Sequence, residues 1–339
     1  MTATDMTPAE EVVAKGLHDL MHSELPDAED VRIEGLRRIS EGLSRENWIF
    51  EGAWHQGGEA VRLPLILRRD PEGSLLETDR RTEYEMLRSL ERAPLPTPRV
   101  LWLDEDGARL GRPSMVMVRE SGECDWFVLN SRRPEDVRLR VARRLVSLLG
   151  QIHRVDWRSI GLDRVLTDPG PMASLAEVER WEDQLRRFQL EPHPEMELAS
   201  SWLRARAPES QATVLVHGDY KPGNALLEGE DISAMLDWEL AHLGDPLEDL
   251  GWATNPYRSR EHQIPGLWER EQIVEHYSTE TGFQVGEAEL TWWNVFSCYK
   301  LATIILTGVS VFVAGNFDVI YQAPMSLYRV MFELMDAAE

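Results

Sequence analysis

The chain has 339 residues, of which 42% are hydrophobic and 28% charged, a composition that allows one or two globular domains with a substantial core. Its formal net charge of −23 argues against a nucleic-acid partner, because neutralising a phosphate backbone needs a basic face. Cys124 and Cys298 form neither a disulfide pattern nor a metal-ligand pattern, and the N-terminus lacks the features of a signal peptide. We therefore expect a cytoplasmic protein with no nucleic-acid or membrane partner. The sequence does not indicate whether the protein is a monomer or an oligomer.

The first third of the chain predicts a small sheet with few helices. Hydrophobic periodicity predicts an amphipathic helix at the N-terminus and a second helix after the third of five short strands. In chain order, the predicted elements are a helix from about Pro8 to Leu20, strands Val31–Ile33, Trp48–Phe50 and Leu63–Leu67, a helix from about Thr78 to Glu91, and strands Arg99–Leu103 and Ser114–Val118.

Beyond Gly122 the pattern becomes mainly helical. Strong helical periodicity covers Glu135–His153, Ala176–Phe188 and Glu195–Arg206. The apolar stretch Leu301–Gly315 is too short to span a bilayer comfortably, so we expect a buried core helix there. Because the sequence contains no low-complexity linker, we expect two packed lobes. We place their boundary near Glu120, which gives residues 1–121 and 122–339.

The segment VLVHGDYKPGNALL, residues 214–227, carries the clearest chemical signal. Asp219 and Asn224 lie on one tight loop, and Asp237 ends the next short apolar run. Magnesium-dependent phosphoryl transfer needs a carboxylate that orients the attacking hydroxyl, and an amide and a second carboxylate that hold the metal. We predict Asp219 as the catalytic base or orienting group, and Asn224 and Asp237 as the Mg²⁺ ligands. An ordinary Gly-Asp turn would explain Asp219 alone, but not all three residues at these offsets.

Two neighbours of the predicted base have expected supporting functions. Only Lys15, Lys221 and Lys300 are lysines among the 36 basic residues, and Lys221 is the one near Asp219. We predict that Lys221 neutralises charge on the transferred phosphoryl group, the alternative being a solvated surface lysine. We expect His217 to brace the loop by hydrogen bonds to the backbone.

This segment resembles the aminoglycoside phosphotransferase family of the protein-kinase-like superfamily, with its H-G-D-x-x-x-x-N loop and following I/L-D-W/F-E strand end. The phrases MLDWELAHLGDPLEDLGW and WWNVFSCYKLATIILTG are similar to a branch that includes kinase-like domains joined to acyl-CoA dehydrogenases. The resemblance implies an α+β, two-lobed kinase-like fold: a small antiparallel-sheet N-lobe that binds the nucleotide and a larger, mainly helical C-lobe. It also implies that Asp245 and Asp249 of the GDPLEDL stretch support the next helix and the catalytic loop.

The resemblance also implies which residues bind the nucleotide. The family pattern has a lysine in the third strand, but Lys15 precedes the whole sheet, so we assign the phosphate grip to Arg68 with Glu83 as its partner. An arginine is usual there in this branch; the alternative is that Arg68 and Arg69 are exposed edge charges. The single-glycine turn carrying Ser44 and Asn47 is expected to cover the phosphates, and the strip containing Met117 and Arg119 to bind adenine.

The acceptor is less constrained by sequence. Candidate contacts are aromatic and amide side chains that more often form core: Trp181, Trp252, Asn255, Tyr257 and Trp292. A cationic acceptor would favour the acidic helix carrying Glu177, Glu179, Glu182 and Asp183, although a solvated face explains these residues equally well.

We therefore predict an ATP- and Mg²⁺-dependent O-phosphotransferase, a small-molecule kinase with an alcohol group as acceptor. The resemblance makes a hydroxyacyl-thioester or another hydroxylated metabolite a more plausible acceptor than an aminoglycoside, and leaves ATP and GTP open as donors. The alternative is a regulatory pseudokinase that binds nucleotide without turnover, suggested by the missing lysine and sparse glycines. A protein kinase is disfavoured because no D-F-G to A-P-E segment follows Asp237.

Overall fold

The computed structural model describes residues 7–39, 46–70, 79–315 and 324–339 of the chain. It contains two compact units, Met1–Glu91 with Thr97–Glu120, and Arg92–Pro96 with Ser121–Glu339. The short segment Arg92–Pro96 groups with the second unit because it is hydrogen-bonded there. The Arg92 side chain donates to the carbonyl of Ile160 at 3.0 Å, and the carbonyl of Pro96 accepts from Met235 N–H at 2.7 Å.

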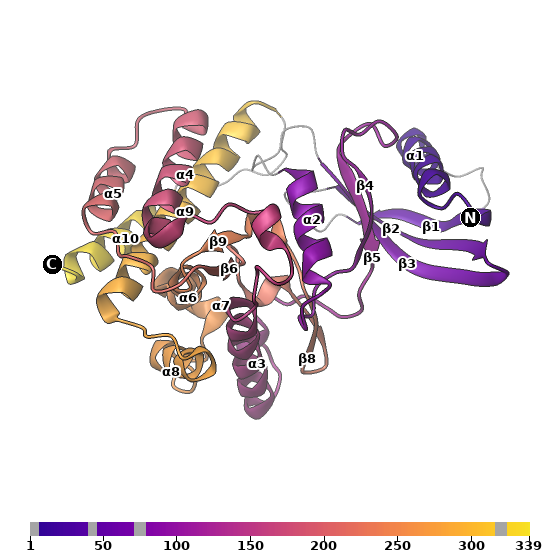
Figure 1. Cartoon of the computed structure of the whole chain (residues 1–339). Helices are drawn as coiled ribbons and strands as arrows, with labels where there is room; N and C mark the ends of the chain where they lie inside the picture. The colour runs from indigo at the N-terminus through magenta and orange to yellow at the C-terminus, as the bar shows by residue number, and fades with distance from the viewer. Residues whose placement is uncertain (1–6, 40–45, 71–78, 316–323) are drawn as a thin grey trace. The chain divides into compact units, whose positions relative to one another are not determined.

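The first unit contains a five-stranded sheet of order β1-β2-β3-β5-β4, in which every neighbouring pair is antiparallel. The sheet has one helix before its strands and one between the third and fourth, as predicted from the sequence (Figure 1). The elements are α1 (Pro8–Glu24), β1 (Glu29–Ile39), β2 (Glu46–Gln56), β3 (Glu59–Arg69), α2 (Arg80–Leu90), β4 (Val100–Asp104) and β5 (Ser114–Val118).

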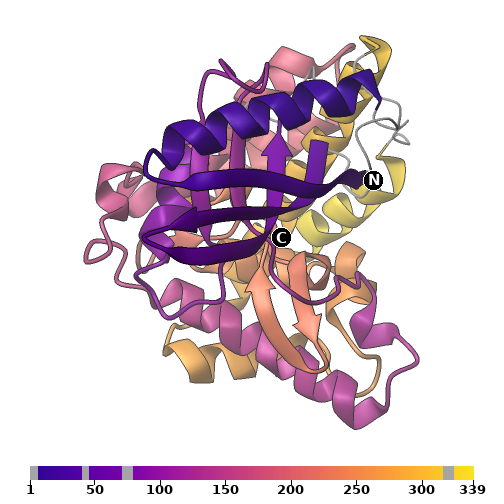
Figure 2. The same cartoon turned by 90° about the vertical axis from the view of Figure 1, so that its right-hand side faces the viewer.

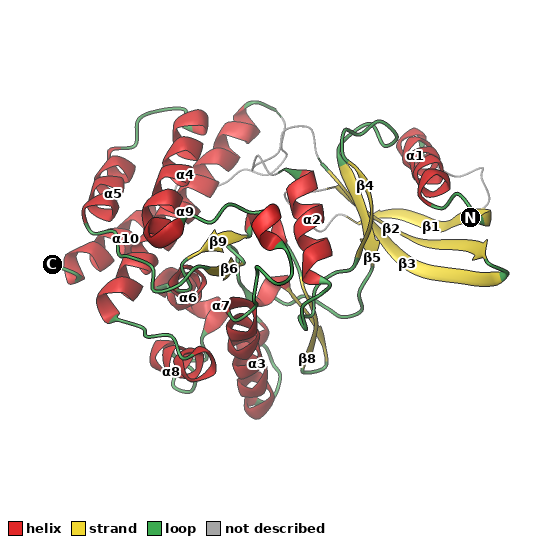
Figure 3. Cartoon of the chain, viewed as in Figure 1, coloured by secondary structure: helices red, strands yellow, loops and turns green. Residues whose placement is uncertain are grey.

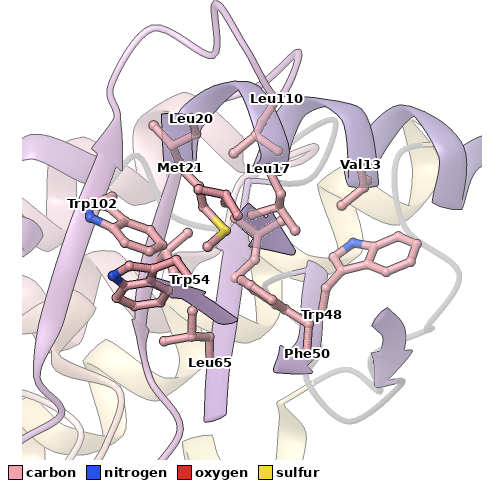
Figure 4. Close-up of a cluster of buried hydrophobic side chains, with 13 residues drawn as sticks. Val13, Leu17, Leu20, Met21, Trp48, Phe50, Trp54, Leu65, Trp102 and Leu110 are labelled. Atoms are coloured by element: carbon pink, nitrogen blue, oxygen red, sulfur yellow. The ribbon is translucent and has the colours of Figure 1, made fainter. Parts of the chain in front are cut away.

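The core of this unit lies between α1 and one face of the sheet. Thr7 and Glu10 form a reciprocal capping box that starts α1, and the helix then presents Val13, Leu17 and Leu20 to the strands. Figure 2 shows this indigo helix lying along the sheet. On β2, the alternate residues Trp48, Phe50 and Trp54 point to the same face and pack against the helix (Figure 4). The intervening residues of β2 therefore belong to the other face, which carries the polar groups described below.

The second unit is mainly helical, with two short sheets of two strands each (Figure 3). Strands β6 (Val214–Val216) and β9 (His242–Gly244) pair with each other, as do β7 (Ala225–Glu228) and β8 (Asp231–Met235). The helices are α3 (Glu135–His153), α4 (Ala173–Phe188), α5 (Pro194–Ala205), α6 (Leu247–Thr254), α7 (Ser259–His262), α8 (Arg270–Thr281), α9 (Glu287–Val313) and α10 (Met325–Ala337).

Helix α9 is the central helix of this unit and contacts α4, α5, α6 and α10. Gly251 of α6 permits the close packing, because a Cβ atom there would lie 2.5 Å from the Cβ of Trp293. Within the described residues, α9 is the one helix long and apolar enough to cross a membrane, and 67% of its apolar window is buried inside the protein. The apolar stretch from residue 301 is thus part of a packed helix, as expected, although the helix begins at Glu287.

Candidate active site

The loop between β6 and β7 brings Asp219, Lys221 and Asn224 together. Lys221 donates to the Asp219 carboxylate, and Asn224 Nδ2 donates both to that carboxylate at 3.1 Å and to the Asp219 carbonyl at 3.0 Å. These bonds use the amide nitrogen of Asn224 and leave its amide oxygen as the atom available to a metal. The side chains of Asp219, Lys221 and Asn224 are therefore neighbours.

Asp219 is held in its ionised form by nearby cations. Burial would raise its pKa, but the positive charges of Lys221 and Arg258 outweigh burial and hold the pKa below its usual value. The Lys221 ammonium also lies 4.4 Å from the centre of the Trp126 ring, which fixes its position from the other side. An ionised carboxylate in this position can accept a hydrogen bond from a hydroxyl and orient it for attack.

Asp237 follows β8 in a left-handed backbone conformation, with φ 65° and ψ 54°. This conformation costs most residues other than glycine about 1 kcal/mol or more, and aspartate and asparagine are among the few that adopt it more readily. The N–H of the preceding Leu236 donates to the carbonyl of Asn224 at 2.7 Å, which ties the two predicted metal ligands together through their backbones. One carboxylate and one amide oxygen suit Mg²⁺, which keeps few protein ligands and takes the rest from water and phosphate.

His217 braces this arrangement as a neutral ring. Its Nδ1 accepts from the N–H of Asp219 at 3.2 Å, so the proton lies on Nε2, which donates to the Leu236 carbonyl at 2.9 Å. Burial lowers the pKa of His217, which favours the neutral form that this hydrogen-bond pattern requires. The ring therefore connects Asp219, the predicted base, to the segment after β8 that carries Asp237, the predicted metal ligand.

Asp249 of α6 holds the start of the loop through hydrogen bonds to its backbone. Its carboxylate accepts from the backbone N–H groups of His217 at 2.7 Å and Gly218 at 2.9 Å, and from His153 Nε2 at 3.1 Å. Burial would raise the pKa of Asp249, but the hydrogen bond and charge of His153 outweigh burial and lower it. No sequence motif indicated His153, since it ends a predicted helix with nothing to mark its buried partner.

Asp245 caps the helix that carries Asp249. Its carboxylate accepts from the N–H of Leu247 at 2.7 Å, at the start of α6. Burial raises the pKa of Asp245 to about 6, so this carboxylate is held ionised at a cost to the folded state at neutral pH.

We expect Asp245→Asn to stabilise the protein at pH 7 by up to about 3 kcal/mol, because the amide oxygen keeps the cap without a buried charge. The folded pKa, about 6, lies above the unfolded value of 3.8, so the stability cost is present above pH 6. It disappears as the pH falls from 6 to 4. Urea unfolding of both proteins across this range should show a difference that shrinks with falling pH; a constant difference would contradict the assignment.

On the first unit, Arg68 and Glu83 form the pair assigned to the phosphate grip. Arg68 at the end of β3 lies 3.4 Å from the Glu83 carboxylate of α2. Arg80, which sequence analysis did not identify, binds the other oxygen of Glu83 at 2.6 Å and also pairs with Asp70. The Arg80 side chain is 2% exposed and that of Arg68 14% exposed, so the inner arginine supports Glu83 while the outer one retains access to solvent.

Asn47 lies directly across the sheet from Arg68 in the pairing of β2 with β3. Its amide oxygen is buried and accepts no hydrogen bond from any described residue. Ser44, the other residue expected to cover the phosphates, lies outside the described residues. Asn47 therefore contributes an uncommitted buried polar atom beside the predicted cation.

The strip expected to bind adenine is well integrated in the sheet. Met117 is buried and pairs with Ile66 on one side and Val100 on the other. The N–H of Val118 donates to the Arg99 carbonyl at 2.8 Å, and that of Arg119 to the Pro64 carbonyl at 2.9 Å. A base at this strip would therefore have to use carbonyl groups, or the backbone that follows, in place of these two donors.

A matched pair of variants separates the two arginines that share Glu83. We expect Arg68→Met to weaken nucleotide binding by about ten- to a hundredfold, the value of charge-assisted hydrogen bonds, with little loss of stability because Arg80 still balances Glu83. Arg80→Met should instead destabilise the fold by about 3 kcal/mol, because it leaves Glu83 with a weakened partner in a buried position. Calorimetric titration with nucleotide measures the affinity, and thermal unfolding measures the stability. An unchanged nucleotide affinity in Arg68→Met would show that Arg68 does not bind the phosphates.

The acceptor candidates are mostly core residues. Trp181, Trp252, Asn255 and Trp292 are at most 3% exposed, and only Tyr257, at 42%, is accessible. The indole N–H of Trp292, for example, donates to the Leu203 carbonyl at 3.0 Å.

Each of the four carboxylates on the acidic helix already has a partner within the protein. Glu177 is buried against His242 and Trp181, whereas Glu179 and Glu182 pair with Arg204, and Asp183 with Arg186. A polycation site on α4 is thus not supported, because intramolecular arginines already neutralise these carboxylates.

A family model described as the phosphotransferase enzyme family matches residues 35–282. The chain belongs to this family. This phosphotransferase family member is 29% identical over 262 residues to acyl-CoA dehydrogenase family member 10 of Mus musculus. It is 30% identical over 274 residues to acyl-CoA dehydrogenase family member 11 of Rattus norvegicus. The alignments cover 71% and 74% of this chain but 24% and 34% of those proteins, so the chain spans about a third of their length or less.

Solved structures share the fold of this phosphotransferase family member at low sequence identity. A candidate aminoglycoside phosphotransferase from Ralstonia eutropha JMP134 superimposes with a TM-score of 0.71 at 20% identity, covering 96% of this chain and 98% of that one. LicA in complex with AMP gives 0.62 at 13% identity, covering 98% and 100%. Macrolide 2′-phosphotransferase MphH from Brachybacterium faecium gives 0.56 at 19% identity, covering 96% and 97%. These likenesses confirm the predicted α+β kinase-like fold.

Proposed function

We propose that the protein is an ATP- and Mg²⁺-dependent phosphotransferase that moves the γ-phosphate of the nucleotide to a hydroxyl of a small molecule. The observation that carries the proposal is a pair of hydrogen bonds, one from Asn224 to Asp219 and one from the N–H of Leu236, the neighbour of Asp237, to the Asn224 carbonyl. Family membership and fold neighbours bound to ATP, ADP or AMP support the nucleotide donor.

In the proposed reaction, the acceptor hydroxyl donates a hydrogen bond to Asp219, and its oxygen attacks the γ-phosphorus as the bond to the ADP oxygen breaks. The hydroxyl proton passes to Asp219 late in the transfer, because the lowered pKa makes this carboxylate an orienting group more than a strong base. Lys221 balances the charge that develops on the transferred group. Asn224 and Asp237 would hold Mg²⁺, which neutralises the phosphate oxygens when bound. No covalent enzyme intermediate is required.

For the acceptor, we propose a hydroxyacyl-thioester or another hydroxylated metabolite in preference to an aminoglycoside. Two relatives of 29% and 30% identity are acyl-CoA dehydrogenase family members, and the carboxylates of α4 that could have bound a polycation are paired with arginines. A cytoplasmic location remains part of the proposal, in keeping with two cysteines that form no disulfide.

The test is a panel of hydroxyacyl-thioesters, sugars, amino alcohols and aminoglycosides assayed for ADP release and for an acceptor that gains one phosphoryl group by mass spectrometry. Each active acceptor is paired with its deoxy analogue, which should give no product because the nucleophile is missing. Tight nucleotide binding without turnover on any acceptor would favour the alternative reading, a regulatory pseudokinase.

A further inference from the structure

Lys300 is a buried lysine on α9 whose ammonium group contacts the catalytic loop. The side chain is 1% exposed and is one of three lysines in the chain. Its Nζ donates to the carbonyl of Gly218 at 2.6 Å and to Glu248 Oε1 at 3.0 Å. The rings of Trp181 and Trp252 lie 5.4 and 5.3 Å away and enclose the charge.

Gly218 is held on both sides by buried charged groups. Asp249 accepts its N–H at 2.9 Å, and Lys300 donates to its carbonyl at 2.6 Å. The residue has φ +82°, and a Cβ atom would lie 2.6 Å from the Leu240 carbonyl oxygen, so only glycine fits. The carbonyl bound by Lys300 belongs to the peptide group that joins Gly218 to Asp219. The orientation of this peptide group therefore determines the position of the Asp219 backbone.

The charge of Lys300 is balanced by a buried network. Glu248 pairs with Lys300 through one oxygen and lies 3.0 Å from His242 Nε2 through the other. His242 in turn lies 3.5 Å from Glu177, which accepts from Trp181 Nε1 at 3.1 Å and pairs with Arg180. Although Glu177, His242 and Glu248 are spaced as metal ligands could be, Lys300 and Arg180 already balance both carboxylates. The cluster is explained as an ionic support without an ion.

We propose that Lys300 is a positioning residue for phosphoryl transfer, which fixes Asp219 by holding the Gly218 carbonyl from a helix 82 residues away in sequence. The proposal rests on the proposed function. A buried ion pair is weak evidence for stability, since apolar residues of similar volume are often as stable or more so. What the ammonium adds here is a directed hydrogen bond to one carbonyl beside the reacting group, and a small displacement of that group is enough to slow transfer.

The test removes the pair without leaving a charge behind. Two double variants, Lys300→Met with Glu248→Gln and Lys300→Met with Glu248→Met, are compared with the matched control Glu177→Gln. The control changes the far end of the same network, keeps the acceptor for Trp181, and does not touch Gly218. We expect kcat to fall by about ten- to a hundredfold in the double variants, with KM for ATP changed by less than about threefold. The control should retain wild-type kcat.

Hydrogen–deuterium exchange gives a readout that does not depend on turnover. In the double variants, peptides covering residues 217–224 should exchange roughly tenfold faster, while peptides of α3 and α8 stay as protected as in the wild type. Unchanged exchange of this loop with unchanged kcat would overturn the proposal, as would a uniform rise across the unit. If neither double variant folds while the control does, Lys300 is a folding residue and the proposal fails. If the wild type turns over no acceptor, the proposed function fails, and loop exchange still decides the effect of Lys300 on Asp219.

Discussion

Asp219→Asn is expected to lower kcat by about a thousandfold with little change in KM for ATP. The amide cannot accept the proton and replaces an oxygen that accepts from both Lys221 and Asn224. Stability should not fall greatly, because removing a buried charge offsets part of the lost ion pair. Steady-state kinetics with the best acceptor, together with thermal unfolding, measures both effects.

The control for this variant is Asp231→Asn, the same chemical change at an exposed position on the neighbouring β8, where Asp231 pairs with Arg144. It should leave kcat within about twofold of the wild type, because exposed ion pairs contribute little. Retained turnover in Asp219→Asn would exclude Asp219 as the orienting group. A different residue would then have to accept the hydrogen bond from the substrate hydroxyl.

Asp237→Asn is expected to raise the Mg²⁺ concentration for half-maximal turnover by at least about tenfold and to lower kcat by about a hundredfold. A neutral amide binds Mg²⁺ more weakly than a carboxylate. Asparagine is the informative replacement because it tolerates the left-handed backbone that Asp237 adopts, whereas alanine would add strain of about 1 kcal/mol.

The measurement is a Mg²⁺ titration of turnover at fixed ATP, with calorimetric binding of ATP in the absence of metal as the control. Metal-free nucleotide affinity should be the same in the variant and the wild type. A Mg²⁺ dependence identical to that of the wild type would show that Asp237 is not a ligand.

Residues that lie close in sequence and act together could be predicted from the sequence. The offsets between Asp219, Asn224 and Asp237 reflect one loop and the next strand, so the motif predicts their chemistry, and the loop does bring the first two into contact. Hydrophobic periodicity likewise predicted α3 with its observed bounds, Glu135–His153, because a long amphipathic pattern leaves few alternatives.

Contacts between distant residues could not be predicted in this way. Nothing near Lys300 indicates that its ammonium lies against Gly218, because only the packing of α9 brings them together. The same limit applies to the tryptophans proposed for the acceptor. A tryptophan has the same appearance in sequence whether its N–H meets a ligand or, as at Trp292, a backbone carbonyl of the core.

The membership of Arg92–Pro96 in the second unit bears on how the chain can be recombined. Because the polypeptide passes from one unit to the other at residues 91/92, 96/97 and 120/121, no single cut separates them. A chimaera that took residues 1–120 from a relative would also replace Arg92 and its hydrogen bond to Ile160. Grafts intended to change nucleotide preference should therefore carry two inserts and leave the five recipient residues Arg92–Pro96 in place.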